Sequence, residues 1–257
     1  NLITAHDFKQ YNATLGDTIL GTGYGFIYTL APVITPTLSG AVAKTYDTTT
    51  NAAISGLSVS SIGSVDGDTV VLSALTSASF DDKNAGAGKT VSSNLLSIAS
   101  ASNGAKPVFG YQLASTTASA NIGTITPASI TAVTGIAANN KTYDASTAAT
   151  INTGAAGFTG IIGADVLNVA TASGNFSDKN VGTGKTVNIS GIALGGADAG
   201  NYTLTMPTAT AVANITPASL TVNGQTASNK VYDATASATL AGGTLSGVLG
   251  SDVVSLH

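Results

Sequence analysis

The chain has 257 residues, of which 9% are charged, and its formal net charge is -4. All nine basic residues are Lys, Cys is absent, and Ser and Thr together make up about a quarter of the chain. The small number of basic residues argues against nucleic-acid binding, and the absence of Cys excludes disulfides, zinc–thiolate sites and cysteine nucleophiles. No run approaches the roughly 18 consecutive apolar residues of a transmembrane helix, so no membrane span is expected.

Short segments in which apolar and polar residues alternate recur along the chain. Examples are residues 69–75, 185–194 and 218–224, and clusters of Gly, Asn and Asp separate such segments. Glu is absent and Met is rare, while Thr, Ser, Val and Gly are abundant, so helices are disfavoured. The pattern predicts an all-β fold of short strands, with room for one helical turn near 195–201.

The motifs of these segments repeat in a fixed order at a spacing of about 90–97 residues. The order is Ile-Thr-Pro, Lys-x-Tyr-Asp, an Asp before an apolar strand, Phe-x-Asp-Lys-Asn-x-Gly-x-Gly-Lys-Thr-Val, and Tyr-x-Leu. A unit of this length has the size of a domain. We therefore predict complete repeats over 34–124 and 125–214, and the first half of a repeat over 215–257.

Residues 1–33 resemble the half that this last repeat lacks. Phe8 and Asn12 fall on the spacing of Phe176 and Asn180, although the Asp-Lys-Asn core is lost. We predict that residues 1–33 are the second half of a degenerate repeat.

Two explanations of these incomplete ends stay open. In the first, the chain is a window of a longer tandem array. In the second, residues 1–33 of one copy complete residues 218–257 of another by strand complementation. Such a contact need not close on itself, so it would produce head-to-tail filaments.

The Lys-x-Tyr-Asp motif supplies the most regular aromatic positions of the chain. A repeated Tyr is expected to anchor the core, and the Asp after it to cap the following turn. A ligand contact is the alternative. The residues concerned are Tyr46, Asp47, Tyr143, Asp144, Tyr232 and Asp233.

The longer motif ends in Gly-Lys-Thr, which invites a phosphate-loop interpretation. A phosphate loop needs a Gly five residues before the Gly of that triplet, and Lys83 and Lys179 stand there. We favour a turn between two strands, with positive φ at its Asn or its glycines. The structural residues of this motif are Phe80, Asn84, Phe176 and Asn180.

Scattered Asp residues raise the question of bound calcium. Calcium needs several converging oxygens, and the chain has no Asp-x-Asp-x-Asp loop, so turn caps are favoured and no cofactor is expected. The two His residues do not recur in the repeats, which argues against an enzyme. The Asp residues considered for calcium are Asp66, Asp68, Asp165, Asp178 and Asp198.

One tight aromatic cluster lies near the beginning of the chain. Tyr24, Phe26 and Tyr28 alternate, which places them on one face of a strand. We interpret this face as core. A carbohydrate-binding platform and an inserted donor strand are the alternatives.

The two repeated motifs, together with residues 198–204 and 215–222, resemble the YDG-type repeats of filamentous-haemagglutinin-like bacterial surface adhesins, which are often exported by two-partner secretion. The resemblance covers residues 34–257. It implies an extracellular, all-β, stalk-like module without catalytic residues, at the bacterial cell surface or secreted. The Gly of the family's Tyr-Asp-Gly is replaced here, which puts the turn at that point in question. The replacing residues are Thr48, Ala145 and Ala234.

We therefore expect tandem antiparallel β-sandwich repeats of Ig-like type, with β-grasp-like repeats as the alternative. The expected function is that of a non-catalytic structural repeat region of an adhesin or extracellular fibre. Its expected partners are neighbouring repeats or further copies of the chain. The alternative function is a carbohydrate- or host-ligand-binding adhesin module.

Overall fold

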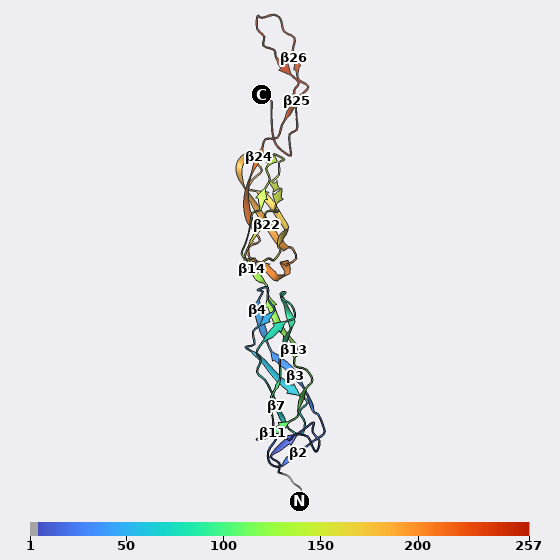
Figure 1. The fold of residues 1–257 in the computed structure, drawn as a ribbon. Coiled ribbons are helices and arrows are strands. Elements are labelled where there is room, and N and C mark those ends of the chain that lie inside the picture. Colours follow the sequence, from blue (N-terminus) through green and yellow to red (C-terminus); the bar gives the residue numbers. More distant parts are fainter. Residues whose placement is uncertain (1–4, 257) are drawn as a thin grey trace. The chain divides into compact units, whose positions relative to one another are not determined.

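The computed structural model describes residues 5–256, whose regular secondary structure is almost entirely β-strand (Figure 1). Residues 1–4 of the predicted N-terminal segment, and His257, lie outside the described residues. The chain folds into two compact units. Unit 1 holds the described residues as far as Ala128 together with Gly200–Tyr202, and unit 2 holds Ser129–Ala199 and the residues from Thr203 on.

The predicted all-β fold is confirmed. Over residues 5–256, one turn of 3-10 helix, η1 (Ala199–Asn201), is the single helical element. It lies inside the stretch 195–201, where the sequence left room for a helical turn. This part of the chain contains no helix long and apolar enough to cross a membrane.

Unit 1 contains the first thirteen strands in three sheets. Their orders are β2-β1-β11-β10-β7, β12-β3-β6 and β4-β13-β9-β8-β5. The strands are β1 (Phe8–Gln10), β2 (Gly25–Ile27), β3 (Val33–Gly40), β4 (Val42–Thr45), β5 (Asn51–Ala52), β6 (Leu57–Ile62), β7 (Thr69–Leu72), β8 (Ala78–Phe80), β9 (Gly86–Ser93), β10 (Ile98–Asn103), β11 (Lys106–Phe109), β12 (Gln112–Leu113) and β13 (Ala118–Thr126).

Unit 2 is organised around one five-stranded sheet of order β17-β24-β22-β21-β18, with several two-stranded pairs beside it. The strands from β14 on are β14 (Ala128–Ile130), β15 (Ala132–Thr134), β16 (Ala137–Ala138), β17 (Lys141–Thr142), β18 (Ala148–Ala149), β19 (Ile151–Asn152), β20 (Gly157–Thr159), β21 (Asn168–Phe176), β22 (Gly182–Gly195), β23 (Tyr202–Leu204), β24 (Ala209–Thr216), β25 (Thr221–Asn223), β26 (Thr226–Ala227), β27 (Leu240–Ala241) and β28 (Thr244–Ser246).

The five-stranded sheets that carry the two complete copies of the motifs have the same plan. In each sheet the strand ending in Phe pairs with the strand that begins at Gly-x-Gly, so that Phe80 lies opposite Val91 and Phe176 opposite Val187. These four side chains are buried, at 0–3% exposure. The repeat found in the sequence is therefore a repeat of strand order and of core positions.

Alternation along the strands builds thin cores. In β3 the inward positions carry Ile34, Pro36 and Leu38, while Thr35 is exposed and Thr37 is half-buried. The Ile of each Ile-Thr-Pro motif is buried, as Ile34, Ile125 and Ile215 at 0–1% exposure. Because large side chains are few, each buried Ile or Phe supplies about 1.5–3 kcal/mol of a small hydrophobic total.

Most strand pairs are antiparallel, as predicted, but the strand of the Lys-x-Tyr-Asp motif pairs in parallel. Lys44 of β4 lies opposite Ile125 of β13, and Lys141 of β17 lies opposite Ile215 of β24. The chain reaches this position only after crossing the length of a repeat, since parallel neighbours cannot be joined by a hairpin. The Lys-x-Tyr-Asp strand of a repeat therefore lies beside the strand at the end of that repeat.

The N-terminal segment is placed differently from the predicted correspondence of Phe8 with Phe176. Strand β1 pairs in parallel with β11, and Lys9 lies opposite Val108, which is the pairing that β4 and β17 make. Lys9 and Tyr11 thus hold the place of the Lys and Tyr in Lys-x-Tyr-Asp. Phe8 and Phe176 share a spacing but not a structural position, because Phe176 belongs to an antiparallel hairpin and Phe8 to a parallel strand pair. The boundaries of the four predicted segments stay a prediction.

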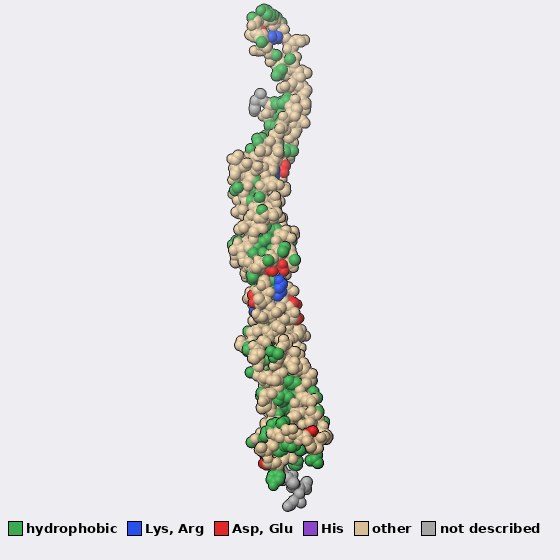
Figure 2. Space-filling view, viewed as in Figure 1, with side chains coloured by type: hydrophobic (Ala, Val, Ile, Leu, Met, Phe, Trp, Pro, Cys, Tyr) green, Lys and Arg blue, Asp and Glu red, His purple; other side chains and the backbone are tan. Residues whose placement is uncertain are grey.

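The described residues from 217 on form two short antiparallel pairs, β25 with β28 and β26 with β27. Their side chains are mostly exposed, and Tyr232 is 89% exposed while Tyr46 is 1% exposed. The visible face of the described chain is dominated by small polar side chains and backbone, with few charges (Figure 2). This agrees with the low content of charged residues.

Candidate functional site

The Lys-x-Tyr-Asp motif forms a compact turn held by its own side chains. The Asp47 carboxylate accepts hydrogen bonds from the Thr49 amide at 2.9 Å and from the Thr49 hydroxyl at 2.8 Å. Lys44 Nζ donates to the same carboxylate at 2.7 Å and to the Thr49 carbonyl at 2.6 Å. The Lys44 ammonium lowers the pKa of Asp47 to about 2, and the Thr49 hydrogen bonds act in the same direction.

The same turn occurs in all three copies. Lys141 lies 2.7 Å from Asp144, and Lys230 lies 2.8 Å from Asp233. The turn around Asp233 forms even though Tyr232 beside it is exposed, so it needs only local sequence. A hydroxyl residue two positions after the Asp completes each turn. This position was not singled out from the sequence, although its recurrence in all three copies is a signal that could have identified it. The hydroxyl residues are Thr49, Ser146 and Thr235.

The residue that replaces the family's Gly adopts a left-handed backbone in every copy. The φ angles are 68° at Thr48, 64° at Ala145 and 59° at Ala234. Gly tolerates this region, whereas a Cβ carries a penalty of about 1–2 kcal/mol there. The turn thus has the backbone that a Gly would favour, and it bears strain because Gly is missing.

Restoring that Gly is expected to stabilise the protein. Thr48→Gly should raise the free energy of unfolding of unit 1 by about 1 kcal/mol, since Thr is β-branched and its strain is removed. Chemical denaturation monitored by circular dichroism measures the change. Thr50→Gly is the matched control, which should be destabilising because Thr50 has no positive φ to relieve. Equal effects of the two substitutions would contradict the explanation.

The Asp-Lys-Asn segment forms the turn between β8 and β9 and again between β21 and β22. Asp82 accepts from the Asn84 amide at 2.6 Å and from Lys89 Nζ at 2.6 Å. Asp178 accepts from the Asn180 amide at 2.8 Å and from Lys185 Nζ at 2.6 Å. In both copies the Lys lowers the pKa of the Asp. The positive φ angles fall on Gly88 and Gly184, which lie in β9 and β22 just after the turn, and not on the Asn residues.

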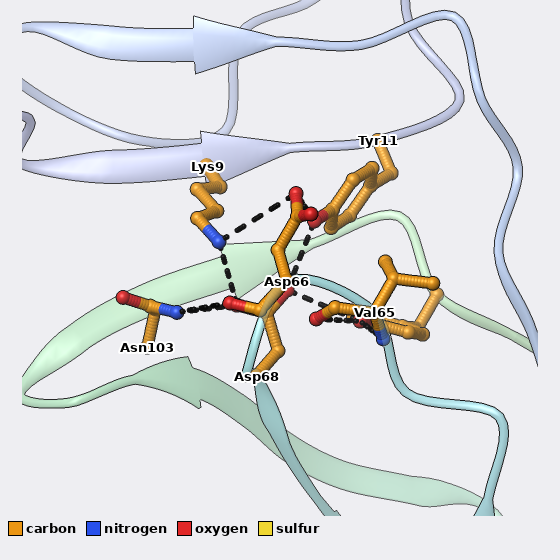
Figure 3. A network of polar contacts seen from close by, with 7 residues as sticks. Lys9, Tyr11, Val65, Asp66, Asp68 and Asn103 are labelled. Atoms are coloured by element: carbon orange, nitrogen blue, oxygen red, sulfur yellow. Dashed lines mark hydrogen bonds and ion pairs between the residues drawn. The ribbon is translucent and has the colours of Figure 1, made fainter.

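A buried polar network in unit 1 is centred on Asp68 (Figure 3). The Asp68 carboxylate, whose side chain is 0% exposed, accepts from Lys9 Nζ at 2.8 Å and from Asn103 Nδ2 at 2.8 Å. Its second oxygen accepts from the Tyr11 hydroxyl at 3.0 Å and the Tyr111 hydroxyl at 3.1 Å. Four donors from segments far apart in the sequence therefore converge on one carboxylate.

The local turn explains why Asp68 points into this network. Asp66 and Gly67 both have positive φ, as in a type I′ turn, and the Asp68 amide donates to the Val65 carbonyl at 2.9 Å. Lys9 is available to Asp68 because Asn12 stands where Asp47 stands after Lys44, so no local carboxylate competes. The sequence indicated a recurring Asp here but not its Tyr partners.

Burial and hydrogen bonding oppose each other at Asp68. Burial alone would raise the pKa of Asp68, but the hydrogen bonds from Lys9, Asn103 and the two tyrosines outweigh it, so the pKa is lowered. Burial, together with the hydrogen bonds to Asp66 and Asp68, raises the pKa of Tyr11 well above its usual value. The carboxylate is therefore charged and Tyr11 is protonated at neutral pH.

A smaller version of this network lies in unit 2. The Asp252 carboxylate accepts from the Tyr143 hydroxyl at 2.6 Å and from Lys179 Nζ at 3.1 Å. Tyr143 and then Lys179 lower the pKa of Asp252. Its side chain is 26% exposed, so the carboxylate is less enclosed than that of Asp68. Asp68 and Asp252 occupy the same position of the repeat. Tyr11 and Tyr143 are equivalent in the strand pairing, because each stands two residues after the Lys of a strand that pairs in parallel.

The aromatic cluster divides into packed and exposed members. Tyr28 stacks on Tyr11 at 4.9 Å between ring centroids, and Phe26 lies 6.4 Å from Tyr28. Tyr24 is 80% exposed. The three side chains therefore do not share one environment, and Tyr24 alone presents its ring to solvent.

Within residues 5–256, no group of three or more His or Asp side chains is placed to hold a metal ion. Asp66 and Asp68 face Lys9, and Asp178 belongs to the turn already described. Asp198 accepts from the Val166 amide at 2.9 Å. These carboxylates are engaged with donors of the protein itself.

A family profile described as the YDG domain matches residues 30–118, 126–211 and 216–257. The chain belongs to the YDG domain family. No curated protein and no solved structure matches it. In this chain the Lys, the Asp and a following hydroxyl residue of each YDG motif hold a turn. In one copy the Tyr, Tyr143, also donates to a carboxylate far along the sequence, that of Asp252.

Proposed function

We propose that this chain is a non-catalytic structural repeat region of a bacterial cell-surface adhesin or secreted extracellular fibre, with a role in cell adhesion and biofilm. The observation that carries the proposal is the Asp68 network, where motif residues from distant segments bind one another. Because these motif residues hold the chain together through contacts with one another, they support a structural role. The resemblance to filamentous-haemagglutinin-like adhesins supports the extracellular setting.

A second form of this proposal adds head-to-tail association, with residues 1–33 of one copy complementing residues 218–257 of another. The two-stranded pairs β25–β28 and β26–β27 leave backbone donors and acceptors at their edges, which favours strand addition. Strand β2 lies at the edge of its sheet, while β1 pairs with β11 in the same chain. Complementation therefore has to use β2 or release β1.

A carbohydrate- or host-ligand-binding module is the alternative function. The exposed ring of Tyr24 favours it, since an uncovered aromatic face suits stacking on a sugar. Titration with simple glycans, comparing the wild type with Tyr24→Ala, separates the two functions. Saturable binding that Tyr24→Ala removes would support the module.

Negative-stain electron microscopy combined with light scattering on the purified chain tests the structural proposal. Under head-to-tail association we expect fibres whose growth depends on protein concentration, and deletion of residues 1–33 should abolish them. A monodisperse monomer would contradict association between copies and leave the chain as a structural segment of a longer array. Turnover of any substrate would contradict the non-catalytic role.

A further inference from the structure

In unit 1 the consecutive residues Asn201 and Tyr202 are bound by the Asp-Lys-Asn turn and by the Tyr of Lys-x-Tyr-Asp. Asn201 Oδ1 accepts from the Ala85 amide at 2.8 Å, and its Nδ2 donates to Asn84 Oδ1 at 3.2 Å. The Tyr202 ring meets the Tyr46 ring edge-on at 5.5 Å. Asn201, Tyr202 and Tyr46 are all buried. The turn after Phe80 and the Tyr of Lys-x-Tyr-Asp therefore act together as a receptor for Asn-Tyr.

The same receptor is built in unit 2. Asp178 and Lys185 hold the turn at Asn180 with the contacts that Asp82 and Lys89 make at Asn84. The Lys directly before this Asn lies over the Tyr ring in both units. Its Nζ is 5.9 Å from the ring centroid for Lys179 and Tyr143, and 5.8 Å for Lys83 and Tyr46. The four residues that would grip an incoming Asn-Tyr pair are Tyr143, Lys179, Asn180 and Val181.

These four residues line a hollow of about 490 Å³ in unit 2, which Leu220 and Asp252 also border. Tyr143 is half-buried, whereas Tyr46 is 1% exposed, and Val181 is 49% exposed. Among the described residues of unit 2, no Asn-Tyr pair borders this hollow. The receptor is thus formed but uncovered.

A second aromatic pair in unit 1 indicates which groups the occupant should bring. Tyr111 meets the Tyr11 ring edge-on at 5.3 Å, and its hydroxyl donates to Asp68. Asp252 already holds the Tyr143 hydroxyl as Asp68 holds that of Tyr11. A Tyr entering the hollow would therefore find both a ring to pack on and a carboxylate for its hydroxyl.

We propose that this hollow binds the Asn-Tyr segment of a further YDG repeat. The Asn side chain bridges the Val181 amide and the Asn180 side chain, and the Tyr ring covers Tyr143 with its hydroxyl on Asp252. The inference rests on the proposed structural role, because it takes the partner to be a repeat of the same kind. The structural role then includes a specific contact, in which one repeat binds the Asn-Tyr segment of the next.

A synthetic peptide of residues 198–205 (Asp-Ala-Gly-Asn-Tyr-Thr-Leu-Thr) is the probe, titrated into the full ¹⁵N-labelled chain. We expect saturable shifts of the Val181 and Asn180 amide resonances, with a dissociation constant of about 1 mM or below. A peptide with Ala at the Asn position should bind about fivefold more weakly, and one with Ala at the Tyr position at least about tenfold more weakly.

Variants of the chain complete the test. Asn180→Ala should weaken peptide binding about fivefold, while Asn188→Ala, an exposed Asn on β22, should leave it unchanged. Shifts that a scrambled peptide produces equally, or no shifts up to about 5 mM peptide, would overturn the proposal. The titration does not require fibres, so a monomeric chain that binds the peptide separates failure of association from failure of this site.

Discussion

Asp68→Ala is expected to lower the free energy of unfolding of unit 1 by about 3–5 kcal/mol, because it leaves a buried ammonium without its partner. Lys9 is 7% exposed at its side chain and has Asp68 as its nearest carboxylate, at 2.8 Å, with Asp66 at 3.9 Å. The hydroxyls of Tyr11 and Tyr111 and the amide of Asn103 lose the same acceptor. Urea denaturation measures the loss, and hydrogen exchange in β7 and β10 assigns it to unit 1.

Asp66→Ala is the matched control for this substitution. The Asp66 side chain is 53% exposed and lies farther from Lys9, and the Tyr11 hydroxyl that it also binds at 2.9 Å keeps Asp68 as an acceptor. The loss of Asp66 should therefore cost about 1 kcal/mol. If Asp66→Ala and Asp68→Ala destabilised unit 1 equally, the network would owe its stability to net charge and not to the enclosed carboxylate.

The Asp68 contribution also has a predictable pH dependence. The pKa of Asp68 is lower in the folded protein than its ordinary value of 3.8. Its stabilisation is therefore fully present above the pKa of the unfolded carboxyl group and is lost as the pH falls through the folded pKa. The stability difference between the wild type and Asp68→Asn should hold from pH 7 to about pH 5 and shrink below about pH 4. A difference that stayed constant down to pH 2 would contradict this assignment.

Phe80→Ala is expected to be comparably damaging, at about 3–5 kcal/mol, because it opens a cavity in a core with few large side chains. Phe80 is 3% exposed, and Lys44 Nζ lies 5.6 Å from its ring centre. Gly123 lies against the ring so closely that an added Cβ would overlap it. The surrounding backbone is thus shaped around the ring, and collapse of the cavity is limited. Thermal denaturation by calorimetry measures the loss.

Two further substitutions test whether the cavity is the cause. Phe80→Leu keeps most of the buried volume and should cost less than about 1.5 kcal/mol. Phe176→Ala should match Phe80→Ala, since Phe176 is also 3% exposed, faces Val187 and has Lys141 at 5.4 Å. A large cost for Phe176→Ala beside a negligible one for Phe80→Ala would show that the two copies do not have equivalent cores.

Much of the fold was predictable from the sequence because its motifs repeat. Alternation and composition indicated strands, and the recurrence of Phe80 as Phe176 marked equivalent core positions. The Asp of Lys-x-Tyr-Asp is engaged with its own turn because Asx turns depend on residues two or three positions away. Such local chemistry can be read from a short stretch of sequence.

Long-range contacts were harder to predict. Nothing near Asp68 in the sequence identifies Lys9 or Tyr111 as its partners, which lie 59 and 43 residues away. The parallel pairing of β4 with β13 depends on a crossover of the whole repeat, which periodicity does not reveal. The spacing that linked Phe8 to Phe176 was misleading, since spacing along the chain does not fix which strand pairs with which.

The parallel pairing of the Lys-x-Tyr-Asp strand of a repeat with the last strand of that repeat has a mechanical consequence. When a polypeptide is pulled from both ends, β4 and β13 are drawn in opposite directions along their own axes. Their hydrogen bonds are then loaded together in shear, whereas a hairpin pulled open at its ends loses its bonds one after another. The same holds for β17 and β24. A repeat with this connection therefore resists tension with all the hydrogen bonds of this parallel ladder at once.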